Sequence, residues 1–330
     1  MKGALGLIQL ALVAGALFVL ATAAVCNTVY PWLRPHMAAL HPTRRARLLR
    51  LWCAAPVLAA VLLTALCLLP SGVGRWAPAF DHCPHHDDGH AHLCLVHLPA
   101  SAGDPAGWVA IGGVVILALA TAGTRLRRLR HGWRMLAGLA ATASYDSSLD
   151  VQVVESAAPL AVTTGLARRT IFLSAGLLRG LPGELLPPVI EHERAHARRR
   201  DPLWRLLTHL LATLHLPATR QRLLADHALA CEQACDEAAA IQVGDRLWVA
   251  QAMFAVRRME PRGAMDLGVT ATSFGECGVV ARVEALLDDA LPVASSRWWP
   301  AVWVVVATAA IASAPALHHF TESVLAPLAR

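Results

Sequence analysis

Four long apolar runs constrain the fold of this chain more than any other feature of its sequence. They cover residues 4–25, 51–69, 108–124 and 298–314. A helix needs roughly 20 apolar residues to cross the hydrocarbon core of a bilayer, and each run is near that length. The chain is also 56% hydrophobic and only 16% charged, which is unusual for a soluble domain. We therefore expect a mainly α-helical membrane protein with four transmembrane helices.

The first run has an alternative interpretation as a cleaved signal peptide, because Lys2 precedes it and small residues lie at 21–23. The run is longer than an ordinary signal core, which favours a retained span. At the last run, three tryptophans suit the membrane interface: Trp298, Trp299 and Trp303.

Arginines orient the expected helices. The connection between the first two runs holds five arginines and the segment after the third run holds five more, whereas the second connection has Arg75 with four aspartates. By the positive-inside rule the arginine-rich segments lie in the cytoplasm and both termini lie outside the inner (cytoplasmic) membrane. This topology also accounts for most of the net charge of +6. We therefore expect membrane lipid as a partner and no direct contact with nucleic acid.

Three regions follow from this topology. Residues 1–134 hold three transmembrane helices, residues 135–297 form a cytoplasmic domain, and residues 298–330 form the fourth transmembrane helix and a short outer tail. The outer loop at 81–97 is rich in imidazoles and thiols, which suit Zn²⁺ or copper. A disulfide between its two cysteines, or a solvated tract without fixed ligands, are the alternatives. The residues concerned are His82, Cys83, His85, His86, His90, His92, Cys94 and His97.

The cytoplasmic segment contains the motif His-Glu-x-x-His at His192, Glu193 and His196. Pro187 and Pro188 suit the first turn of a helix that we expect to run to about residue 200. Residues four apart share one face of a helix, so both imidazoles can bind one Zn²⁺. The glutamate beside the first ligand can take a proton from a metal-bound water, which predicts Glu193 as the catalytic base. A chance match in a His-rich chain is the alternative, and a third ligand would argue against it.

A second helix, expected at 226–238 with Asp226 as its N-cap, offers that third ligand. Glu232 and Asp236 lie four apart on it and share a face. A zinc hydrolase needs one ligand besides its two histidines, and Glu232 can supply it. Asp236 can accept a hydrogen bond from a ligand imidazole and fix its tautomer. The alternative is an exposed acidic helix face. Cys231 and Cys235 are expected to be small packing residues.

The remaining signals around the motif are weaker. Residues 151–155 and 170–174 read as strands of a small sheet, whose exposed edge can hold an extended peptide. Residues 203–216 are apolar but too short to span a bilayer, so we expect a buried or membrane-apposed helix there. An oxyanion-stabilising group is also needed, and three residues remain open for this role: Tyr145, His209 and His227.

The sequence resembles the membrane-bound antirepressor metallopeptidases, a family of beta-lactam-sensing signal transducers with many relatives that lack the sensor domain. Four blocks carry the resemblance, at residues 159–178, 192–204, 232–238 and 282–287. The resemblance implies a gluzincin-like α+β zinc peptidase domain with Zn²⁺ on His192, His196 and Glu232. It also implies cleavage of a cytoplasmic transcriptional repressor, or of the protease itself, after a signal from outside.

Two departures from the family pattern matter. Arg194 replaces the uncharged residue usual inside the motif, but its position on the helix directs it away from the ligands. The segment after the last apolar run is too short for a penicillin-binding domain, so we do not expect beta-lactam sensing. A membrane metal sensor without proteolytic turnover and a membrane quality-control protease are the alternative functions.

Overall fold

The computed structural model describes residues 2–74, 76, 93–95, 140–259, 271–273, 278–288 and 311–325, with scattered residues between 105 and 138 and residue 308. The chain divides into two compact units. The first comprises residues 1–29, 54–121 and 294–330, and the second comprises residues 30–53 and 122–293. Each unit is described by itself.

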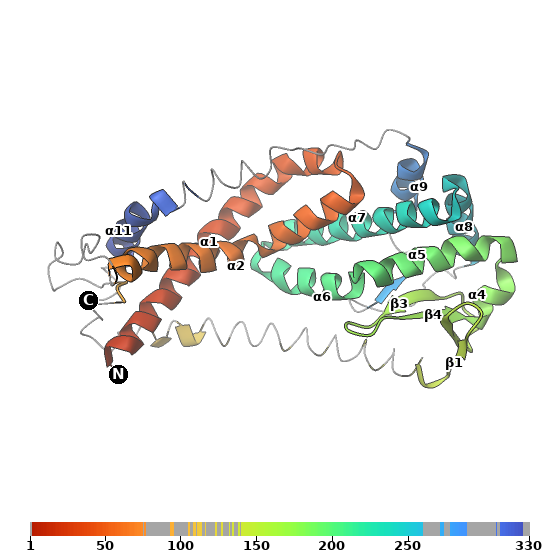
Figure 1. Cartoon of the computed structure of the whole chain (residues 1–330), viewed down its shortest axis with the longest axis horizontal. Coiled ribbons are helices and arrows are strands. Elements are labelled where there is room, and N and C mark those ends of the chain that lie inside the picture. The colour runs from red at the N-terminus through yellow and green to blue at the C-terminus, as the bar shows by residue number, and fades with distance from the viewer. Residues whose placement is uncertain are drawn as a thin grey trace. The chain divides into compact units, whose positions relative to one another are not determined.

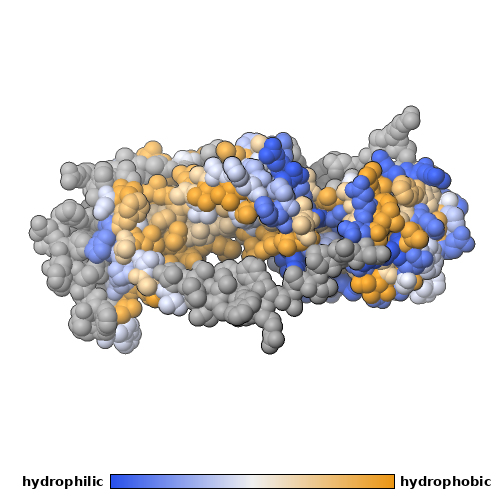
Figure 2. Space-filling view, turned by 90° about the horizontal axis from the view of Figure 1, so that it is seen from above, coloured by the Kyte–Doolittle hydropathy of each residue, from blue (hydrophilic) through white to orange (hydrophobic). Residues whose placement is uncertain are grey.

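Two long apolar helices open the chain, α1 (Lys2–Ala38) and α2 (Pro42–Gly74) (Figure 1). Both are long and apolar enough to cross a membrane. Their large apolar side chains are widely exposed, Leu20 at 67% and Val61 at 66%, as expected for helices that face lipid. Figure 2 shows apolar surface gathered in this part of the molecule. The first two expected spans therefore appear as helices, while most of the third and fourth lies outside the described residues.

The expected outer tail contains a further helix, α11 (Ala314–Leu325), in the first unit. It buries His318 and Glu322, whose side chains lie 3.1 Å apart. Glu322 also accepts a hydrogen bond from the backbone N–H of Leu93 (3.1 Å). Only residues 93–95 of the His/Cys-rich loop are described, with Cys94 buried, so its other candidate ligands and Cys83 lie outside the described residues.

The second unit contains a five-stranded mixed sheet in the order β1-β2-β4-β3-β5. Its strands β2 (Val151–Val154) and β4 (Thr170–Ser174) confirm the two predicted strands and pair in parallel. The other pairs are antiparallel and involve strands that the sequence did not predict. These are β1 (Ala143–Asp146), β3 (Ala161–Thr164) and β5 (Ala271–Ser273).

Helices cover this sheet and complete an α+β domain (Figure 1). The central helix α5 (Leu186–Arg199) confirms the predicted motif helix, with prolines in its first turn and Arg200 ending it in the left-handed region at φ 58°. It packs along α7 (Pro217–Val243), and Val189, Ile190 and Ala239 join the core. The remaining helices are α4 (Ala175–Gly180), α6 (Asp201–Leu211), α8 (Arg246–Met259) and α9 (Val279–Leu287).

One expectation about these helices needs correction. Asp226 is not an N-cap, because α7 begins at Pro217 and Asp226 lies inside it, where its carboxylate accepts hydrogen bonds from Tyr30 and Arg34. Proline at the first helical position starts this helix earlier than the sequence pattern suggested. The helix expected at 203–216, either buried or apposed to the membrane, is present as α6, which exposes the apolar side chains of Trp204 and Leu210.

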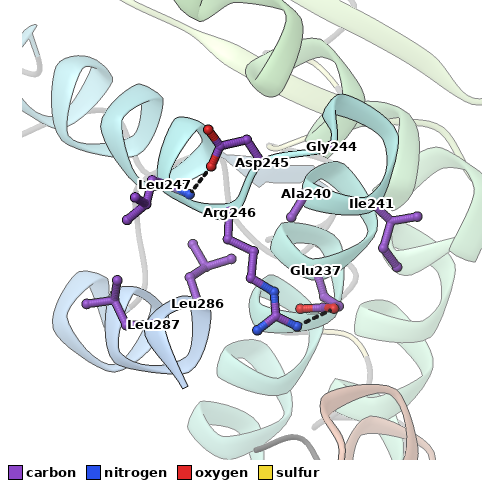
Figure 3. Close-up of a pocket in the computed structure, with 9 residues that line it drawn as sticks. All are labelled: Glu237, Ala240, Ile241, Gly244, Asp245, Arg246, Leu247, Leu286 and Leu287. Carbon is purple, nitrogen blue, oxygen red and sulfur yellow. Dashed lines mark hydrogen bonds and ion pairs between the residues drawn. The ribbon is translucent and has the colours of Figure 1, made fainter. Parts of the chain in front are cut away.

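The ends of α7, α8 and α9 surround a hollow of about 680 Å³ (Figure 3). Gly244 ends α7 at φ 80°, and the side chain of Asp245 accepts a hydrogen bond from the Leu247 N–H at 2.8 Å to start α8. Arg246 then pairs with Glu237 of α7 at 2.8 Å and donates to the backbone of Asp288 at 3.1 Å. These contacts fix α9 against α7, which matters because each helix contributes to the site described next.

Candidate metal centre

Three buried side chains from two helices converge between α5 and α7. His192 and His196 come from adjacent turns of α5, and Glu232 comes from α7. The two Nε2 atoms lie 3.0 Å apart. Each also lies 3.5 Å from an oxygen of Glu232. The structure thus brings together the three ligands predicted from sequence, and their ligand atoms all lie within 4.8 Å of one another.

A carboxylate stands behind each imidazole. His192 Nδ1 lies 3.0 Å from Asp236, as predicted, and His196 Nδ1 lies 2.9 Å from Asp201. When each Nδ1–H faces its carboxylate, the proton is on Nδ1 and the two Nε2 lone pairs face each other. Two acceptors at 3.0 Å need a cation between them. The donor set therefore fits Zn²⁺, which prefers neutral imidazole and carboxylate oxygen.

The charges around these ligands favour a cation. Burial lowers the pKa of His192, but hydrogen bonds to Asp236 and Glu232 outweigh it and raise that pKa to about 9. Burial raises the pKa of Glu232, but the positive charges of Arg282 and His196 outweigh it and lower that pKa to about 2. The site therefore favours positive charge beside an ionised Glu232, which is the role that a divalent cation fills.

Arg282 is a site residue that sequence analysis missed. This buried side chain of α9 donates two hydrogen bonds to Asp236, at 2.8 and 2.6 Å, and its third nitrogen lies 3.1 Å from Glu232. These bidentate hydrogen bonds orient Asp236, the carboxylate next to His192, and the third nitrogen helps to orient the expected third ligand, Glu232. The signal in the sequence was a single cation within the apolar run Val279–Leu287.

Glu193 lies buried beside the ligands and close to the sheet. Thr163 of β3 donates a hydrogen bond to its Oε2 at 2.6 Å, and the same hydroxyl lies 2.8 Å from its backbone carbonyl. Burial raises the pKa of this carboxyl. The positive charges of His196 and His192 lower it and offset part of that rise. Among the described residues, Oε1 of Glu193 has no hydrogen-bond partner. One oxygen is thus fixed and the other is available to a water or a substrate.

Asp201 also connects the site to α2. Its side chain is fully buried and accepts hydrogen bonds from Arg199 at 3.1 Å and from Arg50 at 3.2 Å. Arg50 belongs to α2 and also donates to Nε2 of His227 at 3.1 Å. Sequence analysis missed both roles, because Arg50 and Asp201 lie 151 positions apart and only the packing of their helices brings them together.

The three oxyanion candidates lie in different places. Tyr145 is 60% exposed and donates a hydrogen bond to Asp150 at 2.8 Å. His227 is buried on α7 and accepts from Arg50, and His209 is partly buried on α6. None of the three is selected by these contacts. Arg194 points away from the ligands, as expected, and bonds to Glu191 and to the carbonyl of Leu149.

A second group of potential ligands shares His196 with the first. Cys235 Sγ lies 3.3 Å from His196 Nδ1 and 3.4 Å from Asp201. Burial raises the pKa of Cys235 well above its ordinary value and that of Cys231 to about 12, so both thiols are protonated at neutral pH. Since the Nδ1 of His196 is already bonded to Asp201, this group is the poorer site.

Comparison with known proteins agrees with this geometry. Residues 127–268 match the model of peptidase family M48. Neither the curated proteins nor the solved structures that were compared with the chain gave a match. The matched segment contains His192, Glu193, His196 and Glu232, but the match does not distinguish the antirepressor group from other zinc peptidases. This membrane-associated chain therefore carries a zinc metallopeptidase domain of peptidase family M48, with its His-His-Glu cluster at His192, His196 and Glu232.

Proposed function

We propose that the protein is a zinc endopeptidase with a cytoplasmic active site, which cleaves extended segments of a cytoplasmic regulator, or of its own chain, in response to a signal from outside. The observation that carries the endopeptidase proposal is the pair of facing Nε2 atoms beside Glu232 and Glu193. In this proposal residues 135–297 form the catalytic domain, and the arginine-rich connections keep it in the cytoplasm.

The roles of the side chains follow from their contacts. Zinc held by His192, His196 and Glu232 would supply a Lewis acid and lower the pKa of a coordinated water to about 7. Glu193 takes the proton of the attacking water on Oε1 and delivers it to the leaving nitrogen. Thr163 fixes the other oxygen of Glu193 through the 2.6 Å hydrogen bond. Asp201 and Asp236 keep both ligand imidazoles in one tautomer.

The sheet edge beside α5 supports cleavage of extended chain. Strand β3, which holds Thr163, packs against α5 and pairs on its outer side with β5. The pairing is antiparallel, with Thr163 opposite Thr272 and Val162 opposite Ser273. A substrate can add to such an edge through backbone hydrogen bonds, and here a segment of the same chain already does so. This pairing supports the proposal that the protease can act on itself.

The test compares the full-length protein with Glu193→Gln in detergent, using unfolded casein as substrate. We expect the variant to lose cleavage by roughly 10²–10⁴-fold while retaining zinc, because the general base is removed and the ligands are kept. Glu191→Gln is the matched control, since Glu191 pairs with Arg194 away from the ligands. Equal cleavage by wild type and Glu193→Gln would refute the proposal.

A further inference from the structure

A pocket of about 480 Å³ lies where the turn between α1 and α2 meets α7, within the second unit. Three arginines line it, Arg34, Arg45 and Arg222, against the single carboxylate of Asp226. The rest of its lining is largely apolar and includes Pro31 and Leu49. None of these residues belongs to the zinc centre, so the pocket needs its own explanation.

Its charges are unbalanced. The carboxylate of Asp226 accepts two hydrogen bonds from Arg34, at 2.6 and 2.8 Å, and one from the Tyr30 hydroxyl at 2.7 Å. Arg45 instead donates to two neutral acceptors, the carbonyl of Ala38 and the side-chain amide of Gln233. Its Nε is buried and has no hydrogen-bond partner among the described residues.

Arg222 adds a second cation without changing this balance. It is exposed on α7, one turn before Asp226, and lines the same pocket. After Arg34 and Asp226 are paired, the lining of the pocket still contains two guanidinium groups, those of Arg45 and Arg222. A partly buried guanidinium with an unbonded N–H is a strong donor to a phosphate oxygen, because its planar fork matches two oxygens of that group.

The ends of the expected spans place the pocket at the depth of lipid headgroups. The apolar run of α1 ends at residue 25 and that of α2 begins at residue 51. At about 1.5 Å per residue, Tyr30 lies about 7 Å beyond the first run along its helix. Leu49 lies about 3 Å and Arg45 about 9 Å beyond the second. The headgroup layer is roughly 5–8 Å thick on each side of the hydrocarbon core. A phosphate in this layer can reach the pocket while its acyl chains stay in the bilayer.

We propose that this pocket binds the phosphate group of an anionic phospholipid, with Arg45 and Arg222 as the donors. Arg34 and Asp226 form the wall, and Pro31 and Leu49 contact the glycerol and the first methylenes. A bound headgroup would add to the polar contacts between α1, α2 and α7, which already include the Tyr30, Arg34 and Arg45 bonds described above and the bond from Arg50 to His227. Free phosphate shares the recognition chemistry, but the apolar half of the lining favours a lipid.

Native mass spectrometry of the full-length protein, released from a neutral detergent, tests the proposal. The protein is titrated with phosphatidylglycerol, phosphatidylcholine or inorganic phosphate, and bound copies are counted. We expect one tightly retained phosphatidylglycerol in wild type. Arg45→Gln should weaken its binding roughly ten-fold and Arg222→Gln roughly five-fold, as expected for loss of one charged donor near the membrane surface. Arg47→Gln is the control, because Arg47 is exposed on α2 and does not line the pocket.

Arg45→Gln also removes the contact with Gln233, so it can disturb the fold. Arg222 is exposed, and its substitution leaves the packing of α7 intact, so this second variant keeps the test valid. Zinc content and the unfolding temperature, measured without added lipid, report whether each variant is folded. Binding of inorganic phosphate that is weakened by the same two substitutions would support a phosphate site with a soluble ligand. Equal retention of the two lipids, or equal retention by Arg222→Gln and Arg47→Gln, would overturn the proposal.

Discussion

At the scale of single residues, some groups of the zinc centre can be predicted from the sequence and others cannot. His192, Glu193 and His196 form a local motif, and the spacing of Glu232 and Asp236 on one helix follows the same logic. Arg282 could not be found this way, because its partner Asp236 lies 46 positions earlier and only the packing of α9 on α7 joins them. Periodicity predicts which residues share a helix face but not which faces meet.

His227 provides a prediction about acid stability. Burial lowers the pKa of its imidazole from 6.5 to about 3, with the charge of Arg50 acting in the same direction. Above pH 6.5 the side chain is neutral in both the folded and unfolded states, so it adds no pH dependence there. As the pH falls below 6.5, the unfolded chain takes up a proton that the folded chain refuses, and stability is lost until the pH nears 3. Over the first two pH units this loss is about 1–3 kcal/mol.

The variant His227→Gln keeps an acceptor for Arg50 but cannot titrate. In zinc-free protein we expect its unfolding temperature to fall less than that of wild type between pH 7 and pH 4.5, because the proton uptake by His227 is absent. The measurement is thermal unfolding in detergent at several pH values. Parallel curves for the two proteins would show that His227 is not buried in the neutral state.

At the scale of helices and strands, α5 was predictable because every signal agreed. Prolines in its first turn and basic residues in its last turn mark both ends, and its apolar residues recur with helical spacing. Strands β1, β3 and β5 could not be predicted, because each has three or four residues and little alternation of apolar and polar side chains. Such strands exist because a neighbour supplies their hydrogen bonds, and β5 pairs with a strand more than 100 positions earlier. The start of α7 was placed too late for a similar reason, as its first turns are stabilised by packing.

The contact between Arg50 of α2 and Asp201 at the start of α6 predicts a coupling between a membrane helix and the zinc centre. Arg50 holds one carboxylate oxygen of Asp201 while His196 bonds to the other. Asp201→Asn should weaken zinc binding about 10–100-fold, as is typical when the partner of a ligand imidazole is removed. Arg50 bonds to Asp201 and not to the ligand His196 itself. We therefore expect Arg50→Gln to cause a smaller loss of zinc affinity, roughly 3–10-fold, by the same mechanism. Chelator competition measures both affinities.

The double variant shows whether Arg50 acts through Asp201. If it does, Arg50→Gln adds no further loss of zinc affinity in the Asp201→Asn background, because coupled residues are not additive. Arg47→Gln on the exposed side of α2 should bind zinc like wild type. Independent, additive losses would mean that Arg50 supports only the general packing of α2 against α7.

At the scale of the whole molecule, composition correctly indicated membrane association, and α1 and α2 are the described helices that can span a bilayer. We expect the full chain to remain in the membrane pellet after an alkaline carbonate wash, which removes proteins held only by surface charge. The apolar side chains that α1 and α2 expose are the physical reason. Recovery of the protein in the supernatant, together with a peripheral control protein, would contradict this prediction.

The central claim is that one zinc ion is bound by His192, His196 and Glu232. X-ray absorption at the zinc edge of the purified full-length protein tests it directly. The predicted spectrum has one zinc per chain with two imidazole nitrogens at about 2.0–2.1 Å and oxygen in the remaining positions. Glu232→Gln should lower zinc occupancy, while Cys235→Ala should leave the spectrum unchanged. A sulfur ligand at about 2.3 Å that disappears in Cys235→Ala would contradict the claim and place the metal in the His196, Asp201 and Cys235 group instead.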